Sequence, residues 1–241
     1  MIKVHSYESM GTYDGPGLRL VVFLQGCNFR CLYCANPDTI PSKGGKLTEP
    51  EEIVRMALSQ KTFFGKKGGV TFSGGEPTLQ AKELIPLFRR LKEEGIHICL
   101  DTNGGIMNDE VKELLSLTDL VLLDIKEFNP EHHKILTERS NAQTLSTAAY
   151  LEETKKPMWI RYVLVPEYSD FQEDIIALCE HFESYSMIQR IEILPYHTLG
   201  KHKYEVLKKP YQLEHVKENT PEQLEHAKEL FSRYFPEVYV N

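Results

Sequence analysis

Short apolar runs alternate with longer amphipathic segments along the whole chain. The runs are rich in β-branched and aliphatic residues, which is typical of strands. Nearly unbroken runs such as "LVLL" indicate a sheet that is covered on both faces. We predict six strands, at residues 18–24, 69–73, 96–102, 119–125, 158–165 and 190–196.

The segments between these runs carry apolar residues at helical spacing. Asn108 is a typical residue for the start of a helix, and Gly95 is a typical residue for its end. A repeating strand–helix order implies parallel strands joined by right-handed crossovers, so the predicted fold class is α/β. The units are too few to close a complete barrel, which leaves a partial barrel or a flatter doubly wound sheet. The predicted helices cover residues 49–60, 79–95, 108–117, 141–154, 169–182 and 220–235.

Composition narrows the function classes. The chain has 241 residues and a formal net charge of -7, which argues against a general nucleic-acid binder. The N-terminus lacks the pattern of a secretory signal, and no apolar segment reaches the roughly 18 residues that would span a bilayer. We therefore expect a cytoplasmic protein that binds neither nucleic acid nor membrane.

Three of the five cysteines, Cys27, Cys31 and Cys34, lie within the stretch "GCNFRCLYC". A structural zinc ion takes four protein ligands and would have to recruit Cys99, Cys179 or a distant histidine. Cys99 lies in a predicted core strand and Cys179 in an amphipathic helix, so both are expected to be buried apolar thiols. An iron–sulfur cluster needs only three thiolates when its fourth iron binds a small molecule. The spacing favours the cluster, while a zinc site and inert thiols remain alternatives.

Polar groups follow five of the six predicted strands. Parallel strands place their carboxyl ends at one edge of the sheet, so we expect these groups to form one site. They are Cys27, the segment "SGGEP" from Ser73 to Pro77, Asp101 with Thr102, Asp124 with Lys126, and His197.

The segment "SGGEP" has two interpretations. In the first, it is a strand-to-helix turn in which Gly74 and Gly75 supply unusual dihedral angles and Pro77 begins a helix. In the second, the glycines let a ligand approach the main chain, and Glu76 pairs with the ammonium group of that ligand. Both interpretations stay open at this point.

Asp101, Thr102 and Asp124 could form a site for a hard cation, although ordinary capping also explains such residues at strand ends. Lys126 either pairs with a carboxylate or is solvated, and His197 is either a surface residue or a contact to an adenine or a ribose. "YDGPGLR", ahead of the first strand, is predicted to be a turn.

The motifs "GCNFRCLYC", "SGGEP", "LDTNG", "LLDIK", "WIRYVLVP" and "LPYHTLGKHKY" occur in this order. Together they resemble the radical S-adenosylmethionine (SAM) enzymes, and among them the activases of glycyl radical enzymes. The resemblance runs from Ile2 to the C-terminus. It implies one radical SAM domain over residues 1–241, folded as a partial (β/α)6 barrel with an open lateral side. Residues 35–72 contain no cysteine, so the ferredoxin-like insertion of many activases is absent.

The resemblance also implies the site. Cys27, Cys31 and Cys34 would hold a 4Fe-4S cluster whose fourth iron binds SAM, and no further catalytic residue is needed. Asp14 would face the glycine of the partner. A histidine often stands at the position of Ala35 in relatives, but only the peptide matters there. The implied SAM contacts are Tyr33, Cys34, Ala35, Gly75, Asp124, Ile125, Lys126 and His197, and the implied ligands of a monovalent cation are Asp101, Thr102 and Asp124.

The implied reaction is the reductive cleavage of SAM to a 5'-deoxyadenosyl radical, which takes a hydrogen atom from a glycine Cα of a partner protein. Chain length and the missing insertion favour pyruvate formate-lyase as that partner. The resemblance implies flavodoxin or ferredoxin as the electron donor, and we expect a monomer. Three alternatives remain: an activase of another glycyl radical enzyme, a radical SAM enzyme that acts on a small molecule, and a zinc or iron–sulfur protein without catalysis.

Overall fold

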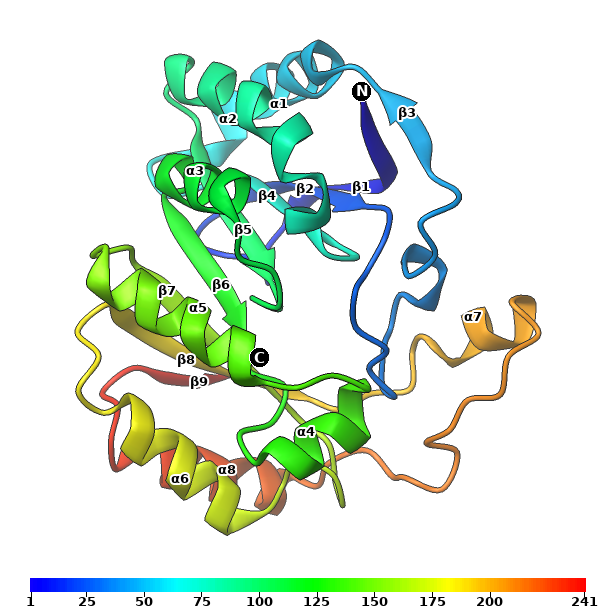
Figure 1. Ribbon diagram of the computed structural model, residues 1–241, viewed down its shortest axis with the longest axis vertical. Helices are drawn as coiled ribbons and strands as arrows, with labels where there is room; N and C mark the ends of the chain where they lie inside the picture. Colours follow the sequence, from blue (N-terminus) through cyan, green and yellow to red (C-terminus); the bar gives the residue numbers. More distant parts are fainter. The chain divides into compact units, whose positions relative to one another are not determined.

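The computed structural model describes all 241 residues, and the chain forms two compact units. The first unit consists of Met1–Asn28 and Thr39–Leu122, and the second of Phe29–Asp38 and Leu123–Asn241. Strands and helices alternate along the chain, as predicted (Figure 1). The chain passes from the first unit to the second within strand β6 (Leu120–Asp124). Earlier in the chain, Phe29–Asp38 belong to the second unit. The chain then returns to the first unit within a single turn of 3-10 helix, η1 (Pro37–Thr39).

The sheet of the first unit has the strand order β3-β1-β2-β4-β5. The predicted strands β2, β4 and β5 are parallel, and Phe72 of β4 pairs with Val22 of β2 and Leu100 of β5. Strands β1 and β3, which the sequence did not predict, join antiparallel at the edge. The bounds are β1 (Ile2–Gly11), β2 (Arg19–Leu24), β3 (Lys46–Thr48), β4 (Gly69–Gly74) and β5 (His97–Thr102).

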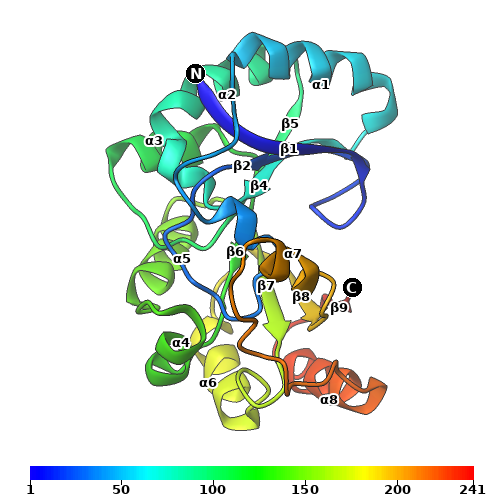
Figure 2. The same cartoon turned by 90° about the vertical axis from the view of Figure 1, so that its right-hand side faces the viewer.

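Three helices cover one side of this sheet (Figures 1 and 2). The side chains of Phe72 and Phe88 are fully buried, and their ring centroids lie 4.7 Å apart between β4 and α2. Asn108 begins α3 as predicted, because its side chain accepts the amide hydrogen of Val111 at 2.9 Å. The bounds are α1 (Pro50–Phe64), α2 (Ala81–Glu93), α3 (Asp109–Leu117) and the 3-10 turn η2 (Pro77–Gln80).

The sheet of the second unit has the order β7-β8-β9, with all strands parallel. Its strands are β7 (Met158–Leu164), β8 (Ile188–Pro195) and the unpredicted β9 (Val238–Val240). Helices α6 and α8 lie side by side below these strands in Figure 1. Its helices are α4 (Pro130–Thr137), α5 (Ala142–Glu153), α6 (Gln172–Phe182), α7 (Lys201–Val206) and α8 (Pro221–Ser232).

The sequence did not predict α4 and α7, which are the two shortest α-helices. Helix α4 depends on its N-cap, since the side chain of Asn129 accepts amide hydrogens from Glu131 and His132. None of the helices combines the length and the apolar character that crossing a bilayer would require.

Candidate functional site

Cys27 lies just beyond β2, at the carboxyl end of the parallel strands of the first unit. Gly26 precedes it with a φ of 103°, a conformation that favours glycine. The amide of Cys27 donates to the carbonyl of Ile40 at 3.1 Å, and Nδ2 of Asn103 lies 4.0 Å from Sγ of Cys27 as a weak donor. The main chain therefore fixes this residue, and an amide group faces its sulfur.

Cys31 and Cys34 lie in the second unit, on a segment that hydrogen bonds to the end of α4. The amide of Leu32 donates to the carbonyl of Leu136 at 3.0 Å, and the amide of Cys34 donates to the carbonyl of Cys31 at 3.1 Å. Burial raises the pKa of the Cys34 thiol. This thiol therefore keeps its proton at neutral pH in the cofactor-free protein and must release it when it binds iron.

Cys27, Cys31 and Cys34 form no disulfide and are partly exposed, whereas Cys99 and Cys179 are fully buried, as the sequence predicted. Within either unit, no group of three or more histidine, cysteine, aspartate or glutamate side chains lies close enough to hold a metal ion. Thiolate sulfur is the ligand type that iron–sulfur clusters take. The chemistry of the three accessible thiols fits such a cluster.

The glycines of "SGGEP" serve close main-chain contacts, as the turn interpretation requires. Gly74 has a φ of 103°. A Cβ atom on Gly75 would lie only 2.0 Å from the carbonyl oxygen of Gly26, so no larger residue fits while this contact lasts. The amide of Glu76 donates to that same carbonyl at 2.7 Å. Gly75 thus joins the end of β4 to the residue that precedes Cys27, and its predicted contact with SAM stays a prediction.

Glu76 is fully buried and has a structural role. Its Oε1 accepts hydrogen bonds from the hydroxyls of Thr78 (2.6 Å) and Thr102 (2.7 Å), and its Oε2 accepts one from the amide of Asn103 (2.8 Å). Burial raises the pKa of this carboxyl, although these hydrogen bonds oppose the shift. Glu76 therefore ties the loop after β4 to the end of β5, and these contacts favour the turn interpretation over a partnership with a ligand ammonium.

Asp101 and Thr102, two of the predicted cation ligands, point to opposite sides of β5. Asp101 accepts a hydrogen bond from the hydroxyl of Ser73 at 2.5 Å, whereas the hydroxyl of Thr102 contacts Glu76 and accepts the amide hydrogen of Gly104 at 3.0 Å. The third predicted ligand, Asp124, belongs to the second unit. The cation site stays a prediction.

Asp124, Lys126 and Tyr33 lie together in the second unit. Nζ of Lys126 is 2.7 Å from Oδ2 of Asp124 and 5.7 Å from the centre of the Tyr33 ring. Burial alone would lower the pKa of Lys126, but the negative charge of Asp124 together with the neighbouring Tyr33 and Cys31 groups outweighs this effect, so the pKa lies well above its ordinary value. Ile125, between the two charged residues, donates its amide hydrogen to the carbonyl of Arg161 at 3.0 Å. Two of the predicted SAM contacts, Asp124 and Lys126, thus form a largely buried ion pair, and a third, Tyr33, lies beside it.

The segment "YDGPGLR" forms the predicted turn. Gly15 and Gly17 have φ values of 117° and 72°. The carbonyl of Asp14 accepts a hydrogen bond from the hydroxyl of Thr71 at 2.6 Å, which fixes the turn against β4. The predicted contact of Asp14 with a partner protein stays a prediction.

Arg19 is a buried residue that the sequence analysis missed. Its guanidinium donates to the carbonyls of Pro16 (3.0 Å) and Val70 (2.7 Å). Arg19 therefore links the turn, at Pro16, to strand β4, at Val70. The only signal in the sequence was a charged residue at the start of an otherwise apolar run, which also fits a solvated strand end.

His197 is exposed just beyond β8, and the main chain of Ala35 lies against Gly200. Two residues of α7, Lys203 and Tyr204, contact the segment after the third cysteine, and the sequence analysis missed both. Both residues belong to the motif "LPYHTLGKHKY", but the sequence of this motif does not indicate which residues their side chains contact.

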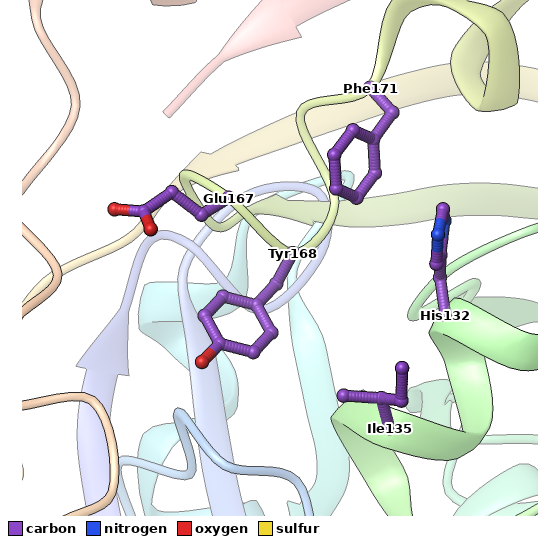
Figure 3. Close-up of a pocket in the computed structure, with 5 residues that line it drawn as sticks. All are labelled: His132, Ile135, Glu167, Tyr168 and Phe171. Atoms are coloured by element: carbon purple, nitrogen blue, oxygen red, sulfur yellow. The ribbon is translucent and has the colours of Figure 1, made fainter.

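A separate pocket of about 300 Å³ lies in the second unit (Figure 3). His132 and Ile135 line it from α4, and Glu167, Tyr168 and Phe171 line it from the loop after β7. Figure 3 shows the ring of Phe171 facing His132, with ring centroids 4.5 Å apart. None of the predicted site residues lines this pocket.

Comparison with known proteins identifies the family. The family model of the radical SAM superfamily matches residues 21–180. A pyruvate formate-lyase-activating enzyme of Streptococcus mutans is 48% identical, and the match covers 98% of this chain and 93% of that protein. The pyruvate formate-lyase 1-activating enzyme of Escherichia coli K12 is 44% identical, with 96% of both chains covered.

Solved structures show the same fold. SuiB of Streptococcus suis, bound to its precursor peptide SuiA, matches 93% of this chain and 49% of its own, with a TM-score of 0.72 and 19% identity. A domain of a pyruvate-formate lyase-activating enzyme from Bacteroides vulgatus matches 72% of this chain and 99% of its own, with a TM-score of 0.61 and 24% identity. The predicted α/β fold of the radical SAM type is confirmed. The chain belongs to the radical SAM superfamily and, within it, to the pyruvate formate-lyase-activating enzymes.

Proposed function

We propose that this chain is an oxidoreductase that activates pyruvate formate-lyase by forming a radical on one of its glycines. The observation that carries the proposal is the near full-length identity to pyruvate formate-lyase-activating enzymes. The 4Fe-4S cluster and SAM are the cofactors of this family, and the chain provides three partly exposed cysteines that form no disulfide, Cys27, Cys31 and Cys34.

In this proposal the thiolates of Cys27, Cys31 and Cys34 would hold the cluster, and an iron without a protein ligand would bind SAM. When bound, the cluster would supply the one electron for the reductive cleavage of SAM to methionine and a 5'-deoxyadenosyl radical, which would take a hydrogen atom from the glycine Cα to give 5'-deoxyadenosine and the glycyl radical. The protein orients SAM, excludes water and other hydrogen donors, and positions the glycine. No acid–base pair of side chains is needed for this chemistry.

The ion pair of Lys126 with Asp124 supports a role in SAM binding. A buried, paired ammonium and carboxylate can orient the amino-acid end of SAM, because that end carries both charges. Tyr33, the peptide from Cys34 to Ala35, Ile125, Gly75 and His197 complete the proposed contacts. Asp101, Thr102 and Asp124 are proposed to bind a monovalent cation, and Asp14 is proposed to face the substrate glycine.

The electron must come from outside the chain. We propose flavodoxin or ferredoxin as the donor, since both carry one electron at low potential. We also propose that the enzyme works as a cytoplasmic monomer and that residues 1–241 act as one radical SAM domain.

Electron paramagnetic resonance tests the proposal. The protein is reconstituted anaerobically with iron and sulfide, reduced, and mixed with SAM and pyruvate formate-lyase. We expect 5'-deoxyadenosine together with the doublet signal of a glycyl radical. Release of 5'-deoxyadenosine without the doublet would assign another substrate, and a colourless protein with one bound zinc ion would refute radical chemistry. Cys31→Ala should lose both the cluster and SAM cleavage, whereas Cys179→Ala should keep both.

A further inference from the structure

Within the second unit, helix α7 contacts residues 31–38, which we call the cysteine segment. The hydroxyl of Tyr204 donates to the main-chain carbonyl of Cys34 at 3.1 Å. Nζ of Lys203 lies 2.7 Å from Oδ1 of Asn36 and 3.2 Å from Oδ1 of Asp38. Two neighbouring side chains of one short helix therefore hold three residues of the cysteine segment, about 170 positions earlier in the chain.

Gly200, which precedes α7, makes the closest approach to this segment. It is buried, and a Cβ atom added to it would lie 2.6 Å from Cα and 2.7 Å from the carbonyl oxygen of Ala35. Its φ of -79° is one that any residue can adopt. The glycine is therefore required by the contact with Ala35 and not by its own backbone conformation.

The helix is itself held in place by a group of tyrosines. The rings of Tyr204 and Tyr211 meet edge to face with centroids 5.0 Å apart, and the hydroxyls of Tyr211 and Tyr196 lie 2.7 Å apart. Tyr196 and Tyr211 are buried together with Val165. Tyr196 immediately precedes His197, so the same packing connects the end of β8 to the cysteine segment.

We propose that Gly200, Lys203 and Tyr204 form a clamp, the α7 clamp, that positions the cysteine segment for its cofactors. The inference rests on the proposed function, since it assigns Cys34 to the cluster and the peptide after it to SAM. The clamp holds the carbonyl of Cys34, the backbone of Ala35 and the side chains of Asn36 and Asp38. These residues make no chemical step, and they act through the main chain that they fix.

A clamp of this kind changes binding through preorganisation. A segment that is free in the cofactor-free protein must be ordered when the ligand binds, and the cost of this ordering lowers affinity. Holding the segment in advance removes that cost. Loss of the clamp should therefore loosen the segment without cofactors and weaken SAM binding with them.

Hydrogen exchange of the cofactor-free protein tests the first effect. Tyr204→Phe removes only the hydroxyl, and Lys203→Met removes only the charged end of the side chain. Each should speed amide exchange of the peptide covering residues 31–38 by roughly 3- to 10-fold, as expected when one hydrogen-bonded contact is lost. The matched controls are Lys201→Met, whose lysine pairs with Glu214 at 3.0 Å, and Tyr150→Phe on α5. Both controls should leave that peptide unchanged.

SAM binding to the reconstituted, reduced protein tests the second effect. The change that SAM causes in the resonance spectrum of the cluster gives a Kd. For Tyr204→Phe and Lys203→Met we expect full iron content and a Kd that is roughly 3- to 10-fold higher. Gly200→Ala should have a larger effect and also lose iron faster to a chelator, because its new methyl group must displace Ala35.

The outcomes separate the clamp from the proposed function. Wild-type exchange and wild-type Kd in both Tyr204→Phe and Lys203→Met would overturn the clamp, even if Gly200→Ala fails to fold. A wild-type protein that holds a cluster but neither binds nor cleaves SAM would overturn the proposed function, while the exchange result would still decide whether the clamp exists.

Discussion

Nζ of Lys126 lies 2.7 Å from Oδ2 of Asp124, and the two side chains are only 13% and 16% exposed. Removing one partner of a buried pair leaves an uncompensated charge. We expect Lys126→Met or Asp124→Asn to lower the free energy of unfolding of the cofactor-free protein by about 3 kcal/mol. Urea denaturation measures this.

Two comparisons control this prediction. The exposed lysine of the Lys46–Glu52 pair, replaced in Lys46→Met, should leave stability unchanged. The double variant Lys126→Met with Asp124→Asn should be less destabilised than Lys126→Met alone. A double variant that loses the sum of the single losses would contradict the pairing.

Glu127 should make stability depend on pH. Burial raises the pKa of this carboxyl from 4.5 to about 7, against hydrogen bonds from the amides of Asn129 and Phe128. The contacts of Tyr162 also favour a protonated Glu127. The hydroxyl of Tyr162 has one hydrogen but lies close to two acceptors, Oε2 of Glu127 (3.0 Å) and the carbonyl of Ser169 (2.8 Å). A protonated Glu127 can donate to the hydroxyl, which then donates to Ser169.

The sign follows from proton binding. Between pH 4.5 and 7 the folded state keeps the proton on Glu127 that the unfolded state has released, so stability falls as pH rises through this window and then levels off. Across this window the free energy of unfolding falls by about 3 kcal/mol. Glu127→Gln should flatten this part of the profile in the cofactor-free protein. Parallel wild-type and variant profiles would falsify the assignment.

Gly75→Ala should damage the cysteine site. Its new Cβ atom would meet the carbonyl oxygen of Gly26 at 2.0 Å, next to Cys27. We expect a loss of about 3 kcal/mol and a lower iron content after reconstitution. Gly95→Ala is the control, because no atom lies within 4 Å of the added Cβ. The φ of 65° at Gly95 should still lower the free energy of unfolding of this variant by about 1 kcal/mol, but the variant should keep its iron. Equal effects of the two substitutions would show that the contact is unimportant.

Thiol labelling should distinguish the two buried cysteines from the partly exposed ones. Burial raises the pKa of Cys99 and Cys179 to about 12, so each has very little thiolate at pH 8. In the cofactor-free protein we expect iodoacetamide to label Cys27 and Cys31 at least about 100-fold faster than these two. Cys34, whose pKa is also raised by burial, should react more slowly than Cys27 and Cys31. Mass spectrometry counts the labels, and all five should react in urea. Fast native labelling of Cys99 would be inconsistent with the fold.

The apolar runs were enough to predict six strands, because β2 and β4 to β8 bury residues on both faces. Strand β1 was missed since most of its residues beyond Val4 are partly or largely exposed, and its pairing with β2 is a tertiary contact. Helix α7 was missed because it is short and buries no residue fully. Its position depends on Tyr204 and Lys203 meeting partners that are remote in sequence.

The three cysteines could be predicted as cofactor ligands because their spacing in the sequence is itself the signal. The role of a residue type that has several common uses in proteins was harder to predict. Glu76 illustrates the limit. A glutamate in a glycine-rich turn can bind a ligand or satisfy buried donors, and only the positions of Thr102 and Asn103 favour the second role. Arg19 illustrates the same limit, because its acceptors are main-chain carbonyls that no sequence pattern marks.

The membership of Phe29–Asp38 in the second unit has a consequence for biosynthesis. This segment is made early, but the residues that hold it, Leu136 and Tyr204, are translated far later. During translation, before Leu136 and Tyr204 have been made, the segment that contains Cys31 and Cys34 lacks the residues that later hold it. We therefore expect the machinery that delivers iron and sulfide to act on the finished chain and not on the nascent one.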